Sequence, residues 1–252
     1  MTTGIEFDGV THRFGSTTAL DSVDLTIRPG VITGLVGRNG AGKSTLCRLG
    51  AALMRPQHGT VRLGGRPLWE DPDAVAQVCL MRDRGSGLEN LTLRSVVGLH
   101  RTFRPQWDEQ TFERLLRRFD VPDHKWPSRL STGQRSALRI ALALASRAEV
   151  TLLDEVHLGL DAVARRWFYE EVLADYTRHP RTIVLSSHLL EEIEQVVEDV
   201  VVVHRGRILA SGDVDTVRAE HAVGAGLPSL TDVLVSLTDT RTDPQTDTEV
   251  TP

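Results

Sequence analysis

The chain has 252 residues, of which 40% are hydrophobic and 25% charged, and its 29 basic and 34 acidic residues give a formal net charge of −5. This composition suits a globular protein with a full core, and the negative balance argues against a nucleic-acid binder that works by overall charge. No apolar stretch approaches the ~18 to 20 residues that cross a bilayer and there are only two cysteines, which excludes an integral membrane protein and a disulfide scaffold and makes a reduced, cytoplasmic setting the simplest interpretation.

The N-terminal part of the chain has the pattern of β-structure. Val23, Leu25 and Ile27 alternate with polar residues, which is the period of two of a half-buried strand. Residues 31–36 form a short apolar run that ends at a glycine, as expected of a strand buried on both faces. A glycine-rich turn and leucines at helical spacing follow, and residues 59–68 indicate a hairpin around two glycines.

The pattern changes between about residues 84 and 131. Strand signals vanish, apolar residues recur at helical spacing, and prolines interrupt the stretch. We interpret it as a helical insertion in an α/β core.

The α/β pattern then resumes. It predicts strands at 150–153 and 182–187, an amphipathic helix over 189–198, and a hairpin around 205–207. Because strands alternate with helices, the sheet should be mainly parallel.

Residues 37–44 match the G-x-x-x-x-G-K-[ST] pattern, between a buried strand and a helix. Glycines let backbone N–H groups approach phosphate oxygens, and the N-terminal dipole of the following helix favours the same anion. We expect Lys43 to reach the β- and γ-phosphates, Ser44 to ligate Mg²⁺ and Thr45 to donate to the α-phosphate; the alternative is a flexible surface turn. The expected nucleotide-binding residues here are Gly37, Arg38, Asn39, Gly40, Ala41, Gly42, Lys43, Ser44 and Thr45.

Two strand ends carry further candidates. Asp154 and Glu155 follow the strand at 150–153, and ligands of open α/β sheets bind at such carboxyl ends. We expect Asp154 to hold Mg²⁺ through water and Glu155 to orient or deprotonate an attacking water; an exposed acidic turn is the alternative. His188 ends the next strand, where it would stabilise charge on the γ-phosphate, with a structural role as its alternative.

Residues 130–134 read Leu-Ser-Thr-Gly-Gln and precede a very apolar helix. Ser131 with Gln134 fits a capping box, which is a structural interpretation. A capped helix start with exposed N–H groups and a hydroxyl is also an anion site, and both interpretations can hold.

Taken together, these motifs resemble the ATPase subunit of an ABC transporter, over about residues 4–237. The similar segments are Walker A at 37–45, the LSGGQ signature at 130–134 with Thr132 in place of its first glycine, Walker B with its catalytic glutamate at 150–155, the D-loop at 159–161 and the switch histidine at His188.

The resemblance implies an α/β fold: a P-loop NTPase core with a mainly parallel sheet, an N-terminal antiparallel β-subdomain and an inserted α-helical subdomain at about 84–131. This nucleotide-binding domain would span 1–237. Residues 238–252 are mostly Thr, Asp, Gln and Pro, with little to bury, and we expect a disordered tail there.

The same resemblance implies ATP and Mg²⁺ as cofactors, and a sandwich of two cassettes. In that sandwich Ser131, Gly133 and Gln134 would act on the ATP held by the other subunit. Phe14 stands where the family stacks an aromatic ring on adenine. Asp83 stands at or near the place of the Q-loop glutamine, where its carboxylate would touch Mg²⁺ or water.

The implied function is an ATP-hydrolysing cassette that pairs with a second nucleotide-binding subunit, identical or not, and powers a separate membrane permease from the cytoplasmic face. Residues 228–234 resemble the tail of the drug- and antibiotic-export branch, which favours export, and no nucleic-acid partner is expected. One alternative is a soluble ABC-type ATPase that acts on ribosomes or DNA. Another is a non-catalytic, ATP-dependent regulatory switch, against which Glu155 and His188 argue. We assign His157, in the loop after Glu155, no role.

Overall fold

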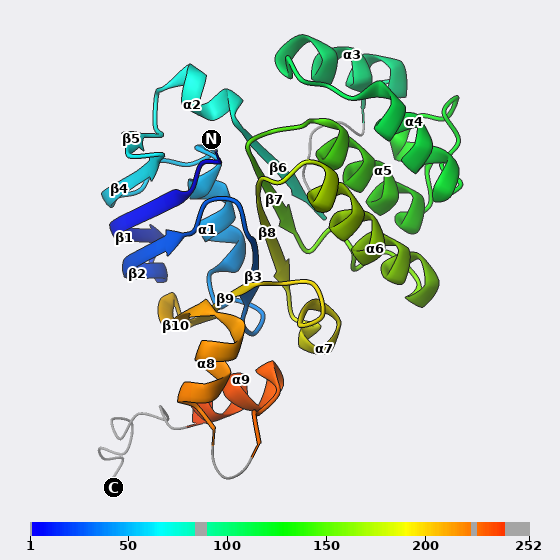
Figure 1. Ribbon diagram of the computed structural model, residues 1–252. Helices are drawn as coiled ribbons and strands as arrows, with labels where there is room; N and C mark the ends of the chain where they lie inside the picture. Colours follow the sequence, from blue (N-terminus) through cyan, green and yellow to red (C-terminus); the bar gives the residue numbers. More distant parts are fainter. Residues whose placement is uncertain (1, 84–89, 223–225, 240–252) are drawn as a thin grey trace, which may run out of the picture.

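A computed structural model describes residues 2–83, 90–222 and 226–239 as two β-sheets with helices around them (Figure 1). The first sheet is antiparallel, with the order β2-β1-β4-β5. Its strands are β1 Ile5–Phe14, β2 Thr17–Ile27, β4 His58–Leu63 and β5 Arg66–Pro67.

The second sheet has the order β10-β9-β3-β8-β7-β6 and is parallel except for β10, which runs antiparallel to β9. Its strands are β3 Ile32–Val36, β6 Val78–Arg82, β7 Val150–Asp154, β8 Thr182–Ser187, β9 Asp199–His204 and β10 Arg207–Asp213. The described helices are α1 Lys43–Gly50, α2 Pro72–Ala76, α3 Leu93–Phe103, α4 Glu109–Arg118, the 3₁₀ turn η1 Pro127–Arg129, α5 Thr132–Ala145, α6 Ala162–Arg178, α7 Leu190–Ile193, α8 Val214–Glu220 and α9 Leu230–Asp239. The predicted fold class, an antiparallel sheet beside a mainly parallel one with inserted helices, is confirmed.

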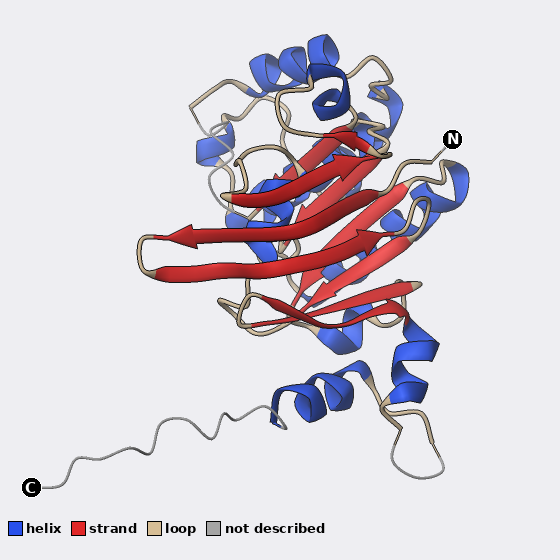
Figure 2. Ribbon diagram, turned by 90° about the vertical axis from the view of Figure 1, so that its left-hand side faces the viewer, coloured by secondary structure: helices blue, strands red, loops and turns tan. Residues whose placement is uncertain are grey.

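Helix α1 lies between the two sheets. A Cβ atom built on its Gly50 would lie 3.3 Å from Phe7 of β1 and 3.6 Å from Leu152 of β7, so the helix touches both layers. The other face of the parallel sheet packs against α5 and α6 in a second apolar cluster. The parallel strands β3 and β7 are buried along their whole length, as expected of strands covered on both faces and as their sequences suggested. Figure 2 shows the long β1–β2 hairpin in front of the parallel strands, with α3 and α4 at one end of the molecule and α8 and α9 at the other.

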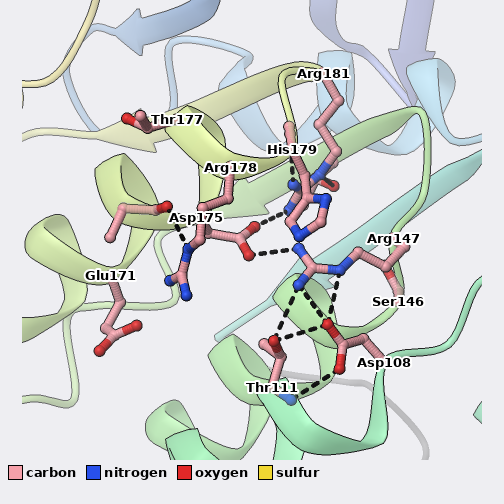
Figure 3. Close-up of polar contacts among 12 residues, drawn as sticks. Asp108, Thr111, Ser146, Arg147, Glu171, Asp175, Thr177, Arg178, His179 and Arg181 are labelled. Carbon is pink, nitrogen blue, oxygen red and sulfur yellow. Dashed lines mark hydrogen bonds and ion pairs between the residues drawn. The ribbon is translucent and has the colours of Figure 1, made fainter.

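A row of alternating charges joins the helical segment to the core (Figure 3). Asp108 caps α4 by accepting a 2.9 Å hydrogen bond from the Thr111 N–H. Arg147, which follows α5, donates to Asp108 Oδ2 at 2.6 Å and pairs on its other side with Asp175 of α6. Arg181, just before β8, lies 2.7 Å from Asp175 Oδ2. We call these four charged residues, Asp108, Arg147, Asp175 and Arg181, the charge row.

Burial of Asp108 alone would raise its pKa, but hydrogen bonds from the Thr111 backbone and the Arg147 guanidinium outweigh that effect and lower the pKa to about 2. Asp108 is therefore ionised at neutral pH, as an ion pair with Arg147 requires.

One predicted element is wrong in extent. The helix expected over 189–198 is the single turn α7, Leu190–Ile193. The chain leaves it early because the Glu198 N–H bonds to the Ile32 carbonyl and Val197 packs 3.3 Å from the position of a Cβ on Gly34, so this segment already runs along β3.

The structure also bears on the ends of the predicted regions. Helix α9 reaches Asp239, two residues into the expected tail, and the remainder of that tail at 240–252 lies outside the described residues, as do residues 84–89 of the helical insertion. Among the residues that are described, no helix combines the length and apolar character needed to cross a membrane.

Candidate active site

The candidate site lies at the carboxyl edge of the parallel sheet, where β3, β8 and β7 end side by side. Val36 pairs with Ser187, and Ser186 pairs with Asp154. This register brings the glycine-rich loop, Glu155 and His188 out of the sheet at neighbouring positions. In the strand order β3 lies between β9 and β8. The glycine-rich loop after β3 therefore leaves the sheet at a topological switch point, where ligands of open α/β sheets bind.

The glycine-rich loop has a backbone that other residues cannot adopt. Gly37 and Gly42 have φ angles of +153° and +116°, and an added Cβ would lie 2.2 Å from the Val203 carbonyl oxygen or 2.7 Å from that of Ala19. Gly42 caps α1 without a side-chain hydrogen bond, and the first turn holds no acidic residue. The amide N–H groups at the start of α1 are thus left for an anion.

Lys43 is buried at the mouth of this loop, with 4% of its surface exposed. Its ammonium Nζ donates to the Gly37 carbonyl at 2.7 Å and lies 3.4 Å from Glu155 Oε1. A buried ammonium must be paired, and here loop carbonyls and one carboxylate satisfy it. A phosphate group bound in the loop would offer the Lys43 ammonium negative charge, as Glu155 does, together with better hydrogen-bond acceptors than the loop carbonyls.

Asp154 is the most buried carboxylate of the site, at 5% exposure. Burial raises its pKa, while the hydroxyls of Ser44 and Ser186 beside it oppose that rise. Its buried Oδ1 has no hydrogen-bond partner among the residues that the structure describes. A carboxylate oxygen without a partner beside a serine hydroxyl is a donor set that suits a hard divalent cation such as Mg²⁺.

Glu155 lies between two other predicted site residues, Lys43 and His188. Its φ of +55° lies in the left-handed region, and its N–H donates to the Ser186 carbonyl at 3.2 Å. Its Oε1 is 3.4 Å from Lys43 Nζ and 3.6 Å from His188 Nδ1. The structure therefore brings Lys43, Glu155 and His188 together, from three separate segments of the chain.

The turn before α5 is a complete capping box. The Ser131 hydroxyl accepts from the Gln134 N–H, and the Gln134 side chain accepts from the Ser131 N–H, both at 3.2 Å. A Cβ on Gly133 would lie 3.3 Å from the Gly159 carbonyl, so the turn packs on the loop that follows β7. Ser131 is exposed, and its structural role as a cap is confirmed.

Two further predicted residues, Phe14 and Asp83, come from the ends of β1 and β6. Phe14 ends β1 and is 46% exposed, with its ring edge against His12. Asp83 follows β6, and its N–H donates to the Asp154 carbonyl at 3.2 Å. Its carboxylate lies 3.9 Å from the guanidinium of Arg139 on α5.

Two buried polar residues near the site were not recognised from the sequence, where Arg139 was not singled out and His157 was assigned no role. Arg139 is 7% exposed inside the apolar stretch of α5, and a cation amid leucines and alanines was the available signal that an acidic partner lay nearby. His157 is 3% exposed, with its Nε2 3.1 Å from Ser187 Oγ. Its neighbours in sequence gave no sign of that contact, which bridges 30 residues of chain.

Residues 20–157 match the profile described as ABC transporter. Daunorubicin resistance ATP-binding protein DrrA3 of Streptomyces coeruleorubidus is 34% identical over 231 residues, which are 86% of this chain and 71% of that protein. Aliphatic sulfonates import ATP-binding protein SsuB 1 of Rhodococcus jostii is 34% identical over 196 residues, 75% and 74% of the two chains. A solved ATP-binding subunit of an ABC transporter superposes with a TM-score of 0.80 at 27% identity, covering 93% of this chain and 99% of that one.

Proposed function

Because this chain belongs to the ABC transporter family, as an ATP-binding subunit that hydrolyses ATP to power a membrane permease, we propose how its own residues perform that hydrolysis. The observation that carries the proposal is the meeting of Lys43, Glu155 and His188 beside the glycine loop, with Glu155 Oε1 3.4 Å from one partner and 3.6 Å from the other.

ATP binds with its phosphates against the amide groups of residues 37–45, and Phe14 packs on the adenine. Lys43 leaves the Gly37 carbonyl for the β- and γ-phosphates, since a doubly charged oxygen cluster is the stronger partner for an ammonium. Ser44 and Asp154, with Asp83 at the same edge, would hold Mg²⁺, which when bound would supply positive charge against the phosphate oxygens.

Hydrolysis is water attack on the γ-phosphorus. The water oxygen forms a bond to phosphorus, the bond to the bridging β-phosphate oxygen breaks, and a water proton passes to Glu155 Oε1. His188 donates to the γ-phosphate as its charge grows in the transition state.

Ser131, Gly133 and Gln134 complete the site of a second nucleotide-binding subunit, which gives ATP-dependent pairing. The exposed, capped start of α5 supports this role because helix N-termini bind anions. The pair docks on the cytoplasmic face of a membrane through its permease. The transporter relatives favour this function over a ribosome- or DNA-directed ATPase or a regulatory switch.

Export is the proposed direction. The daunorubicin resistance named for one relative and the tail-like residues 228–234 support it, whereas the import named for the sulfonate relative supports the reverse. ATP-driven uptake of cargo into inside-out membrane vesicles would favour export, and ATP-driven loss from them would favour import.

The decisive test of the mechanism is Glu155→Gln. Glutamine keeps the size of the side chain but cannot accept the proton, so phosphate release should fall at least 100-fold while ATP binding is retained. ATP-bound pairs should then accumulate in size-exclusion chromatography. Wild-type turnover in this variant would remove Glu155 from its role.

A further inference from the structure

A buried histidine lies next to the site, and the mechanism above does not use it. His157 comes two residues after Glu155 and is 3% exposed. Its ring stacks on Phe168 at 5.7 Å between centroids, with an interplanar angle of 6°, and lies 5.9 Å from the Tyr169 ring. Burial lowers the pKa of His157 to about 4, and interactions with nearby His188 and Arg165 add to this effect, so the imidazole is neutral at physiological pH.

The polar contact of His157 leads to the switch histidine. Its Nε2 lies 3.1 Å from Ser187 Oγ, and that hydroxyl also accepts a 2.9 Å hydrogen bond from the Leu189 N–H. Ser187 and Leu189 flank His188 in the chain, and this hydrogen bond links them to each other. His157 contacts the same hydroxyl, so its ring and the Leu189 N–H both constrain the chain around His188.

The backbone of His157 also shapes the loop that begins at Glu155. Its carbonyl accepts from the Leu160 N–H at 3.0 Å, and the Glu155 N–H bonds to the Ser186 carbonyl at 3.2 Å. The Leu160 bond closes the loop on itself, whereas the Glu155–Ser186 bond and the His157–Ser187 contact join the loop to the end of β8. Glu155 has a positive φ angle, and such a conformation persists only where its surroundings fix it.

We propose that His157 is a positioning residue for ATP hydrolysis, which holds Glu155 and His188 at their working separation through its hydrogen bond to Ser187. The inference rests on the proposed roles of Glu155 and His188. Because His157 touches neither the glycine loop nor Lys43 in the described contacts, its loss should slow the chemical step and leave nucleotide binding intact. Small displacements of reacting groups cost roughly 10-fold to 100-fold in rate.

The test uses the full-length chain and four variants. His157→Phe keeps a stacked ring but removes Nε2, Ser187→Ala removes the same hydrogen bond from the other side, and the double variant removes both partners. His157→Gln places an amide nitrogen near the position of Nε2. Turnover and ATP KM are measured for each below the lowest melting temperature of the set.

We expect kcat to fall about 10-fold or more in both single variants, with ATP KM changed less than about twofold. The double variant should be no slower than the slower single variant, because the two residues act through one contact. His157→Gln should recover most of the rate. A merely structural role for His157 would lower the melting temperature and affect kcat and KM without this coupling or rescue.

Several results would overturn the inference: wild-type kcat in His157→Phe, single-variant losses that multiply in the double variant, or KM rising in step with the loss of kcat. Wild-type enzyme and Glu155→Gln are assayed in parallel. If they differ as expected while His157→Phe equals wild type, only the inference fails. If wild type and Glu155→Gln have equal turnover, the proposed function of Glu155 fails instead.

Discussion

Lys43 shows why a charged side chain can be buried before its ligand binds. The Gly37 and Arg38 carbonyls and the Glu155 carboxylate surround its ammonium, at 2.7, 3.4 and 3.4 Å. The chain has only two lysines and uses arginine for its other basic positions. A compact ammonium fits this enclosure, whereas a planar guanidinium needs a wider space and donates in a fixed fork.

We therefore expect Lys43→Arg to weaken ATP binding at least 10-fold, because the larger head group displaces the loop carbonyls even though the charge is kept. Titration with a fluorescent ATP analogue measures the effect. Lys125→Arg is the matched control, because Lys125 is exposed in the helical segment. This variant should bind ATP with wild-type affinity. Equal affinity in all three proteins would contradict a buried role for Lys43 in binding.

The positions of candidate site residues could be anticipated where they belong to a recognisable spacing. The glycine pattern, the paired carboxylates and the strand-end histidine were all visible in the sequence, because each belongs to a short continuous motif. The pairing of Asp83 with Arg139 was not, since it joins positions on different elements and depends on how α5 packs. The burial of His157 also depends on packing, from Phe168 and Tyr169 of α6.

At the scale of elements, the charge row explains how the helical segment is attached (Figure 3). Arg147 itself has a positive φ of +52°, and its guanidinium bridges the start of α4 and the end of α6 through Asp108 and Asp175. Arg147 and Asp175 are almost fully buried, so each charge depends on its neighbour for compensation.

Asp108→Asn should destabilise the protein by about 1–2 kcal/mol at pH 7, because asparagine keeps the cap of α4 but loses the ion pair with Arg147. Asp108 has a pKa of about 2 in the folded protein and an ordinary value of 3.8. The stabilisation by its charge is therefore complete above the unfolded value and is lost as pH falls through that value toward the folded one.

Urea unfolding at pH 7 and near pH 3 measures both parts of this prediction. The difference in the free energy of unfolding between wild type and Asp108→Asn should be smaller at the lower pH. Asp123→Asn, at a side chain that is 88% exposed, should leave stability unchanged at pH 7. If the difference in the free energy of unfolding between wild type and Asp108→Asn were larger at low pH, the carboxylate would not be the stabilising form of Asp108.

Elements with a single clear period were predictable, and others were not. The strands of the parallel sheet stood out because both faces are covered. Helix α6 gave no signal, because it buries Phe168, Tyr169 and Val172 while it exposes Val163 and Trp167, which spreads apolar residues around its circumference. The predicted helix at 189–198 failed because contacts with β3 outweighed its amphipathic pattern.

At the scale of the whole molecule, the proposed site is divided between two chains. The Lys43 side of each nucleotide belongs to one chain and the Ser131 side to another. A chain damaged on one side should therefore complement a chain damaged on the other, provided that this chain pairs with itself.

We expect Lys43→Ala and Ser131→Asp to be inactive alone and to regain activity when mixed. Roughly a quarter of wild-type turnover should return at equal amounts, because half of random pairs are mixed and each mixed pair has one intact site of two. Aspartate keeps the cap of α5 while its charge repels phosphate. The control mixture, Lys43→Ala with Glu155→Gln, has both defects on the same side and should stay inactive. Equal turnover in the two mixtures would exclude a shared site.

Helix α5 has the Ser131 turn at one end and Arg147 just beyond the other. Its 14 residues make a rigid rod of about 21 Å. If the Arg147 end acts as a fulcrum, a tilt of about 10° sweeps Ser131 through roughly 3–4 Å, the span that separates a hydrogen bond from no contact. With α5 held at Arg147, a small rotation of the helical segment would therefore move the Ser131 turn toward or away from the nucleotide bound by the paired chain.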